Sequence, residues 1–171
     1  MRLLVFIVCA LVSITADADM PLSAPERVTV CSRSGTFCGV SDPAEQLTRV
    51  GPRESEGQPW TIKGWHRWFF VSDDGECAVV GYGGMNLVPR SVSLEEKVLA
   101  FYCRGLLVSE ITLGALYEST SELPFTSSHL VWVNNIFFNA SNQLVVVLPT
   151  GREIAFSARE GKVEEQVRDD T

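Results

Sequence analysis

Short apolar runs alternate with polar, glycine-containing turns along most of this chain, and the pattern predicts antiparallel hairpins. Residues 28–40 read VTVCSRSGTFCGV, and residues 68–80 read WFFVSDDGECAVV. Each stretch places Ser, two polar residues and Gly between apolar, β-branched or aromatic runs, which is typical of a hairpin. The return of this arrangement after 40 residues indicates a repeated unit.

Two more hairpins are indicated further along the chain. Residues 98–111 hold two apolar runs around Arg104-Gly105, and residues 144–157 hold two around Pro149-Thr150-Gly151. Turns at these intervals suit strand-rich repeats with variable connections rather than βαβ units. We predict a mostly β protein whose antiparallel hairpin repeats form a blade-like open sheet or a small sandwich.

Three segments depart from the hairpin pattern. Residues 41–58 are polar and contain several prolines and glycines, which predicts a long connection. The sequence Ser93-Leu94-Glu95-Glu96 matches a capping box, and residues 111–117 have partly helical spacing, so we expect one short helix there. Residues 158–171 contain many charges and few large apolar residues, which predicts a tail that frays after about Lys162.

The N-terminus predicts export. Met1-Arg2 is a short positive start, residues 3–14 are apolar, and Ala16-Asp17-Ala18 fits a processing site, so residues 1–18 match a cleaved signal peptide. The apolar stretch is shorter than the roughly 20 residues that span a bilayer, and no second candidate follows it. The expected organisation is a signal peptide (1–18), a lead-in (19–26), a single β domain (27–157) and a charged tail (158–171).

The charge balance narrows the classes of partner. Removing the signal peptide takes away one basic and one acidic residue, so the net charge stays at −7. A strongly acidic chain disfavours phosphate backbones and anionic membranes as partners. We therefore expect no nucleic-acid partner and, after processing, no transmembrane segment.

Four cysteines remain after processing, and an even number in an exported chain predicts two disulfides among Cys31, Cys38, Cys77 and Cys103. A two-residue loop at Ser34-Gly35 would place Cys31 opposite Cys38 and leave Cys77 for Cys103. A three-residue loop would instead put Cys31 and Cys38 on opposite faces of the hairpin, and the hydrophobic pattern slightly favours this second register. The sequence leaves both registers open.

The sequence FVSDDG at residues 70–75, followed by a β-rich return, is similar to the strand-turn-strand signature of β-propeller blades of the TolB and NHL kinds. In those families the Asp-Gly turn joins two strands of a blade, and the blades serve as interaction platforms or enzyme scaffolds. The resemblance extends over about residues 27–157. Closed propellers use four to eight blades, whereas this chain has material for about two or three, so the resemblance implies an open arrangement. The matching motif is a turn, and no functional residue is carried over from it.

The densest aromatic and basic cluster supplies the candidate binding residues Trp65, Arg67 and Trp68. On a strand, Trp65 and Arg67 would point to one side and Trp68 to the other. An exposed tryptophan beside an arginine is a good stacking anchor for a sugar or a protein. The competing interpretation is that both tryptophans are buried in the core.

No residue constellation predicts catalysis. The two histidines, His66 and His129, are far apart in the sequence, and the neighbouring Ser127 and Ser128 do not make a triad with His129. A nucleophile elbow of the G-x-S-x-G type is also absent from the sequence. We therefore predict no catalytic residues.

Metal, cofactor and modification signals are weak as well. Asp73, Asp74 and Glu76 lack the ligand spacing of a calcium loop and fit a tight turn better. The glycine-rich residues 81–84 lack the spacing of a phosphate loop and are expected to be a strand exit or a bulge. We predict no metal and no cofactor. Asn139 begins an acceptor sequence for glycosylation, which would be used only in a eukaryotic host.

These observations lead to one functional hypothesis and two alternatives. We expect an exported, non-catalytic module of the periplasm or extracellular space that binds a protein or a carbohydrate and could form an oligomer. The first alternative is a secreted hydrolase with a dispersed catalytic set, which would need a cleft that joins a histidine to a carboxylate and a serine. The second is a structural envelope component that adds strands to a partner's sheet, which a long uncovered edge strand would favour.

Overall fold

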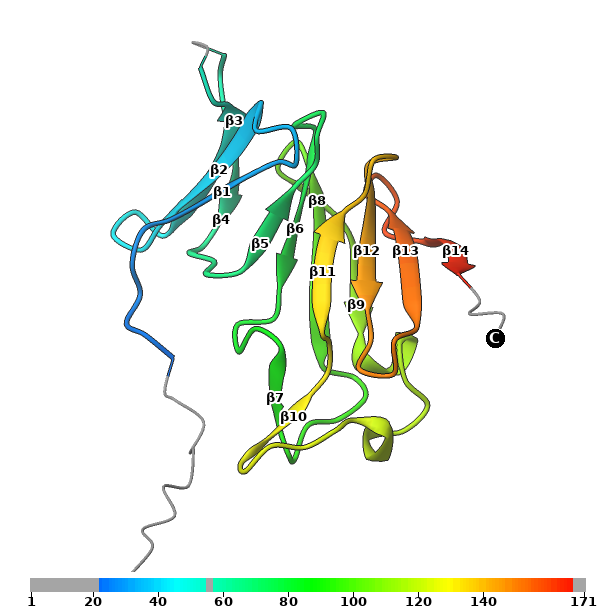
Figure 1. Ribbon diagram of the computed structural model, residues 1–171. Coiled ribbons are helices and arrows are strands. Elements are labelled where there is room, and N and C mark those ends of the chain that lie inside the picture. Colours follow the sequence, from blue (N-terminus) through cyan, green and yellow to red (C-terminus); the bar gives the residue numbers. More distant parts are fainter. Residues whose placement is uncertain (1–21, 55–56, 168–171) are drawn as a thin grey trace, which may run out of the picture.

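The computed structural model describes residues 22–54 and 57–167 and shows a mostly β protein built from three four-stranded antiparallel sheets (Figure 1). The predicted signal peptide lies outside the described residues. The first sheet has the strand order β1 (Val28–Cys31), β2 (Phe37–Asp42), β3 (Leu47–Pro52) and β4 (Trp60–Lys63). The second has the order β5 (Phe69–Val71), β6 (Cys77–Gly81), β8 (Lys97–Cys103) and β9 (Leu106–Thr112). The third has the order β11 (Asn135–Phe138), β12 (Gln143–Val147), β13 (Glu153–Ser157) and β14 (Val163–Val167).

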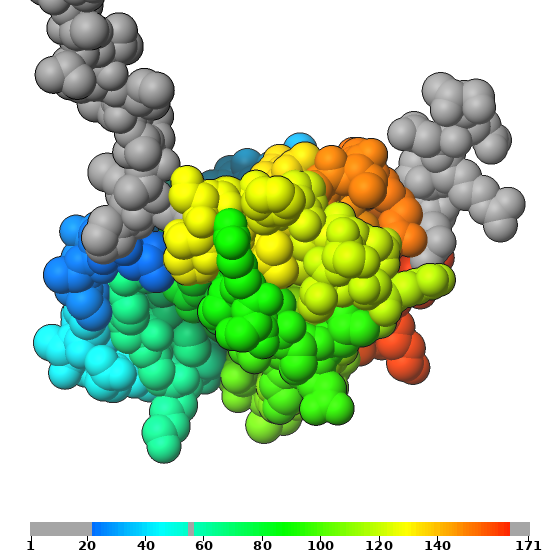
Figure 2. Space-filling model, turned by 90° about the horizontal axis from the view of Figure 1, so that it is seen from below, coloured from blue at the N-terminus to red at the C-terminus, as the bar shows by residue number. Residues whose placement is uncertain are grey.

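A smaller two-stranded sheet pairs β7 (Leu87–Pro89) with β10 (His129–Val131). Its green and yellow segments lie in front in Figure 2, where the molecule is seen from below. Trp132 follows β10 and is fully buried, and its indole donates a hydrogen bond of 2.7 Å to the carbonyl of Met85. This bond fastens the small sheet to the end of the main core.

The three large sheets stack face to face in a row, and their first strands lie nearest to one another. Figure 1 shows the sheets in a row, and β5 in the middle contacts both β1 and β11. We call the face that each sheet turns towards the following sheet its forward face, and the opposite one its rear face. This row of sheets is open and does not close on itself, as the number of hairpins in the sequence predicts.

The middle sheet is buried on both faces, which explains its continuous apolar runs. The interface between the first and second sheets is formed mainly by buried residues, which are Val50, Ile62, Phe69, Val71, Ala78 and Val80. The interface between the second and third sheets belongs to the main core, which includes Val79, Phe101, Ile136, Phe138, Leu144, Val146, Ile154 and Phe156. Among the described residues no further sheet packs on the forward face of the third sheet or on the rear face of the first, although Val145 and Ala155 of that forward face are buried.

Three sequence predictions about the connections are wrong. The expected long connection at 41–58 contains β3, whose pattern is hidden because Thr48 is buried and donates a 2.9 Å hydrogen bond to the hydroxyl of Ser41. The expected tail contains β14, which pairs with β13. In place of the short helix there are two 3-10 turns, Leu113–Ala115 and Thr120–Glu122, and the capping box lies at Ser119 rather than Ser93.

Both disulfides join residues that face each other across neighbouring strands. Cys31 lies opposite Cys38, and Cys77 lies opposite Cys103, which confirms the cysteine pairing of the first register and excludes the second register. The two-residue loop predicted at Ser34-Gly35 is wrong, because the turn runs from Ser32 to Gly35. The hydrophobic pattern misleads here because the covered face of β2 holds a glycine. A Cβ atom on Gly39 would lie 2.4 Å from the Phe69 ring, so the space next to β2 is filled from the second sheet.

Candidate interaction site

Three turns of nearly the same geometry join the first two strands of the three sheets. In each, the amide of the fourth residue donates to the carbonyl of the first: Gly35 to Ser32 (2.9 Å), Gly75 to Ser72 (3.0 Å) and Asn142 to Asn139 (3.1 Å). The fourth residue has a positive φ of 74°, 67° and 61°, respectively. A side chain at the first position holds the turn, since Ser72 Oγ accepts from the Cys77 amide and Asn139 Oδ1 from the Gln143 amide. The sequence repeat therefore has a third copy.

This third copy escapes the sequence analysis because its residues differ. Asn139 stands where the other two turns have serine, and Asn142 stands where they have glycine. Asparagine can accept hydrogen bonds from turn amides, as serine does at the first position, and it tolerates the left-handed backbone conformation, as glycine does at the fourth. The side-chain amide of Asn139 donates a 2.8 Å bond to Gln143 Oε1, so the predicted glycosylation acceptor is engaged in the turn.

Asp73 connects the three turns to one another. Its carboxylate accepts a 2.7 Å hydrogen bond from the Ser34 amide and lies 3.3 Å from the Arg33 guanidinium, both in the first turn. Its own amide donates a 2.7 Å bond to Asn142 Oδ1 in the third turn. The hydrogen bond from the Ser34 amide, with smaller help from Arg33, lowers the pKa of Asp73.

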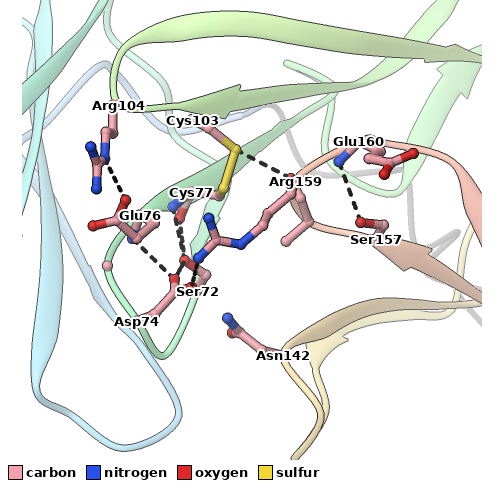
Figure 3. Close-up of a disulfide and its surroundings, with 12 residues drawn as sticks. Ser72, Asp74, Glu76, Cys77, Cys103, Arg104, Asn142, Ser157, Arg159 and Glu160 are labelled. Carbon is pink, nitrogen blue, oxygen red and sulfur yellow. Dashed lines mark hydrogen bonds and ion pairs between the residues drawn. A yellow bond between two sulfur atoms is a disulfide. The ribbon is translucent and has the colours of Figure 1, made fainter.

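Asp74 and Glu76 serve the structure in a similar way (Figure 3). Asp74 accepts bonds from the Ser72 hydroxyl (2.6 Å) and the Glu76 amide (3.0 Å), and Arg159 reaches it from the third sheet at 2.9 Å. Burial works to raise the pKa of Asp74, but these hydrogen bonds outweigh it and the pKa is lowered. Glu76 pairs with Arg104 beside the Cys77–Cys103 disulfide. The acidic residues considered as calcium ligands are thus occupied by turn and inter-sheet contacts.

An apolar groove of about 340 Å³ lies beside these turns, where the first strands of the three sheets meet. Its lining consists mainly of Val30, Phe70, Val71, Ile136, Phe137 and Phe138, together with Cys31 and Arg33. Among the described residues, Arg33 is the one ionisable side chain of the lining, and it pairs with Asp73. This surface can hold an apolar group but offers no acid or base for proton transfer other than a guanidinium.

Val30, Phe70 and Phe137 hold equivalent places in the groove, because each lies two residues before the first residue of its turn. Sequence reasoning missed them as binding candidates. The signal that could have found them is their fixed distance from the three turns, which requires the third turn to be recognised first.

The structure separates the predicted binding residues Trp65, Arg67 and Trp68. Trp68 is partly buried and packs against the core, where its ring makes edge contacts with Phe70 and Trp132 at 5.5 and 6.0 Å between centroids. Trp65 and Arg67 lie in the loop between β4 and β5 and stack at 5.1 Å. Trp65 and Arg67 therefore remain together, whereas Trp68 packs against the core.

The Trp65–Arg67 stack holds the segment before β1. The Trp65 indole donates a 2.7 Å bond to the Glu26 carbonyl, and Arg67 donates a 2.8 Å bond to the Ser23 carbonyl. Both contacts go to backbone oxygens, so they do not depend on the side chains of this lead-in. The predicted aromatic site is occupied by the chain itself.

The two histidines lie in different parts of the fold. His66 belongs to the β4–β5 loop, where its Nε2 lies 3.2 Å from the Lys63 carbonyl and burial lowers its pKa. His129 begins β10, and its Nδ1 lies 2.8 Å from the hydroxyl of the adjacent Ser128. The structure does not bring the two imidazoles into one cleft.

Three further findings concern the cellular compartment, metal binding and membrane-spanning helices. The two disulfides favour a protein of the periplasm or the extracellular space. Within residues 22–54 and 57–167, the histidine, cysteine and acidic side chains form no group of three or more that could hold a metal ion. No helix in this same part of the chain is long and apolar enough to cross a bilayer.

Solved structures similar to this chain include two from bacterial proteins. One is hydrazine synthase of Kuenenia stuttgartiensis (17% identity, TM-score 0.41), covering 81% of this chain and 35% of that one. The other is the periplasmic gluconolactonase PpgL of Pseudomonas aeruginosa (14% identity, TM-score 0.39), covering 82% of this chain and 38% of that one. The chain thus spans little more than a third of either protein. No family model and no curated protein matches it.

The blade-like resemblance noted from the FVSDDG turn agrees with the observed fold. Three antiparallel sheets of four strands in succession, packed face to face with their first strands innermost, are the arrangement of propeller blades. The agreement concerns the blade-like sheets and their stacking, and the described residues form an open row of three sheets.

Proposed function

We propose that this protein is an exported, non-catalytic interaction module whose groove at the first strands receives an apolar group of a protein partner. The observation that carries the proposal is the composition of the groove, in which apolar side chains from three sheets surround a volume of about 340 Å³. Apolar pockets with few polar groups favour apolar side chains over carbohydrate, which needs many hydrogen-bond partners.

The rigidity of the surrounding turns supports a binding role. Asp73 ties the first and third turns to the second, so the strands that line the groove are held in fixed positions before any partner arrives. A site formed in advance loses less conformational entropy on binding than a mobile one. The predicted signal peptide and the disulfides support placing this interaction outside the cytoplasm.

Capture of partners from the exported fraction tests this function. We expect Val30→Asp to abolish capture, because a carboxylate in the groove would have to lose its hydration without a partner. Val30→Thr nearly preserves the side-chain volume and should weaken capture less. The matched control is Phe125→Asp, because Phe125 is 75% exposed and does not line the groove. Identical captured proteins for all variants, with folding intact, would refute the proposal.

A second candidate function is supported by β9. This seven-residue strand forms the outer edge of the second sheet, and Leu106, Leu107 and Val108 are 74%, 52% and 42% exposed. An apolar edge strand can pair with a strand of another protein, as a structural envelope component would require. Loss of partner capture in Leu107→Lys, with capture retained in Val30→Asp, would favour this candidate over the groove.

A further inference from the structure

Two faces of the three sheets have no neighbouring sheet among the described residues, whereas the other four faces each pack on one. Counting from each turn, Phe137 in β11 is equivalent to Val30 and Phe70, which pack against the following sheet. Phe137 has no following sheet in the described chain and is 38% exposed. The forward face of this sheet also contains Val145 and Val147 from β12, which lie on the same side of the strand pair as Phe137. Val145 is only 5% exposed, so Phe137 is the more exposed apolar side chain of the face.

The rear face of the first sheet is the second face without a neighbouring sheet among the described residues. Cys31 is equivalent to Val71 and Phe138, which are 2% and 6% exposed in the two interfaces between sheets, whereas Cys31 is exposed. On the second strand of each sheet, Val40 is likewise equivalent to Val80 and Val146. In place of a packed sheet, this rear face carries a hollow of about 530 Å³.

The charges of the two uncovered faces are opposite. The hollow is lined by Arg27, Arg49 and Arg53. Glu153 belongs to the forward face of the third sheet, since it lies opposite Val147, and Glu164 pairs with Gln143 at the same face. Arg49 also contacts Glu45 of its own sheet, and its side chain remains 40% exposed. The forward face thus offers the partly exposed ring of Phe137 together with acidic residues, and the rear face offers a hollow with basic ones.

We propose that two copies of the chain associate so that the forward face of each third sheet packs on the rear face of the other copy's first sheet. The contact repeats the stacking already present twice within the chain and inserts Phe137 beside the Cys31–Cys38 disulfide. Contacts of this head-to-tail kind form rings when their rotation closes. Two copies of three sheets complete a ring of six, a number within the range that propellers use. The contact shares Phe137 with the groove, but it does not require a partner in the groove.

The mass of the disulfide-bonded, exported chain in solution tests the proposal. Light scattering after gel filtration, between about 1 and 100 µM, is expected to show twice the monomer mass, as the typical affinities of specific complexes would give. A monomer throughout this range, or open polymers of increasing length, would overturn it.

Substitutions identify the faces involved. We expect Phe137→Asp to raise the dissociation constant at least about 30-fold, the size of a hot-spot loss, while Phe125→Asp at an exposed site away from both faces leaves it unchanged. Arg49→Glu and Glu153→Arg should each weaken the dimer, and their combination should recover part of the loss. A dimer that resists both Phe137→Asp and Arg49→Glu, with native circular dichroism, would show that other faces are used. Phe137 also lines the groove, so partner capture is scored with Val30→Asp and dimerisation with Arg49→Glu. Arg49 is not in the groove lining and Val30 is not in the lining of the hollow, so the groove and the dimer can fail independently.

Discussion

The carboxylate of Asp73 accepts a hydrogen bond of 2.7 Å from the backbone amide of Ser34, 39 residues earlier in the chain. The two residues belong to turns of the same type in neighbouring sheets, so the motif that closes one hairpin also fastens that hairpin to the one before it. The Asp73 amide repeats this connection to the following sheet through Asn142. The turn motif is therefore an inter-sheet joint as well as a local hairpin feature.

Replacing Asp73 tests this joint through the pH dependence of stability. Because the pKa of Asp73 is lowered in the fold, the unfolded chain binds more protons in acid. The stabilisation is present above the ordinary carboxyl pKa of 3.8 and is lost as the pH falls through the lower folded value. We expect Asp73→Asn to cost about 1 kcal/mol at pH 7 and to flatten the loss of stability in acid.

Urea unfolding of the wild type and Asp73→Asn at pH 7, 5, 4 and 3 measures this effect. The control is Glu95→Gln, which removes one charge at an exposed position between β7 and β8. Parallel stability curves for the wild type and Asp73→Asn over this range would contradict the role assigned to the carboxylate.

Substitutions at Asn139 test whether the third turn is a true copy of the other two. Asn139→Ser should keep nearly full stability, since Ser32 and Ser72 hold the same place in their turns. Asn139→Ala leaves the amides of Ser141 and Gln143 without their side-chain acceptor and should cost about 1 kcal/mol. Thermal unfolding of both variants measures the difference, and equal destabilisation by serine and alanine would show that the turns are not equivalent.

The two disulfides are expected to contribute unequally to stability. Cys77 and Cys103 are 26 residues apart in the sequence, whereas Cys31 and Cys38 are 7 apart. The longer loop restricts the unfolded chain more, and the chain-entropy relation gives a difference of about 1 kcal/mol. Urea unfolding of two variants, each with one cysteine pair changed to alanine, measures it. A larger loss from removing the Cys31–Cys38 pair would reverse the expected order.

Trp65 and Trp68 should respond differently to substitution, although both were predicted as binding residues. Trp68→Ala removes the contacts with Trp132 and Phe70 and should cost about 3 kcal/mol. Trp65→Ala loses one hydrogen bond to Glu26 and the stack with Arg67, so global stability should fall by about 1 kcal/mol or less.

Limited proteolysis distinguishes the two tryptophans further. Cleavage within residues 22–27 should become faster in Trp65→Ala, because the lead-in loses a contact that holds it. Unchanged cleavage there would mean that the stack does not retain this segment. The hypothesis that the aromatic cluster binds a partner fails if both variants also capture the same proteins as the wild type.

The sequence by itself determined the hairpins, their turns and the class of the fold. The apolar runs around Gly35, Gly75, Gly105 and Gly151 all form antiparallel strand pairs. A hairpin requires alternating side chains and a turn residue that tolerates positive φ, and both requirements can be read from neighbouring residues. The four cysteines of an exported chain allow three disulfide connectivities. One of the two registers considered for the first hairpin gave the connectivity that the structure shows.

Only the tertiary structure decided what each face and loop contacts. The strand β3 carries a buried Thr48, satisfied by Ser41 from β2, so no apolar pattern marks it. Trp65 and Trp68 look alike in sequence, yet Trp68 packs against the core and Trp65 holds the lead-in. The groove and the two uncovered faces arise from the stacking of whole sheets, which depends on contacts between residues far apart in the chain. The spacing of apolar residues along a strand does not indicate which distant residues it will contact. The sheets could therefore be predicted from the sequence, whereas the surfaces could be described only from the tertiary structure.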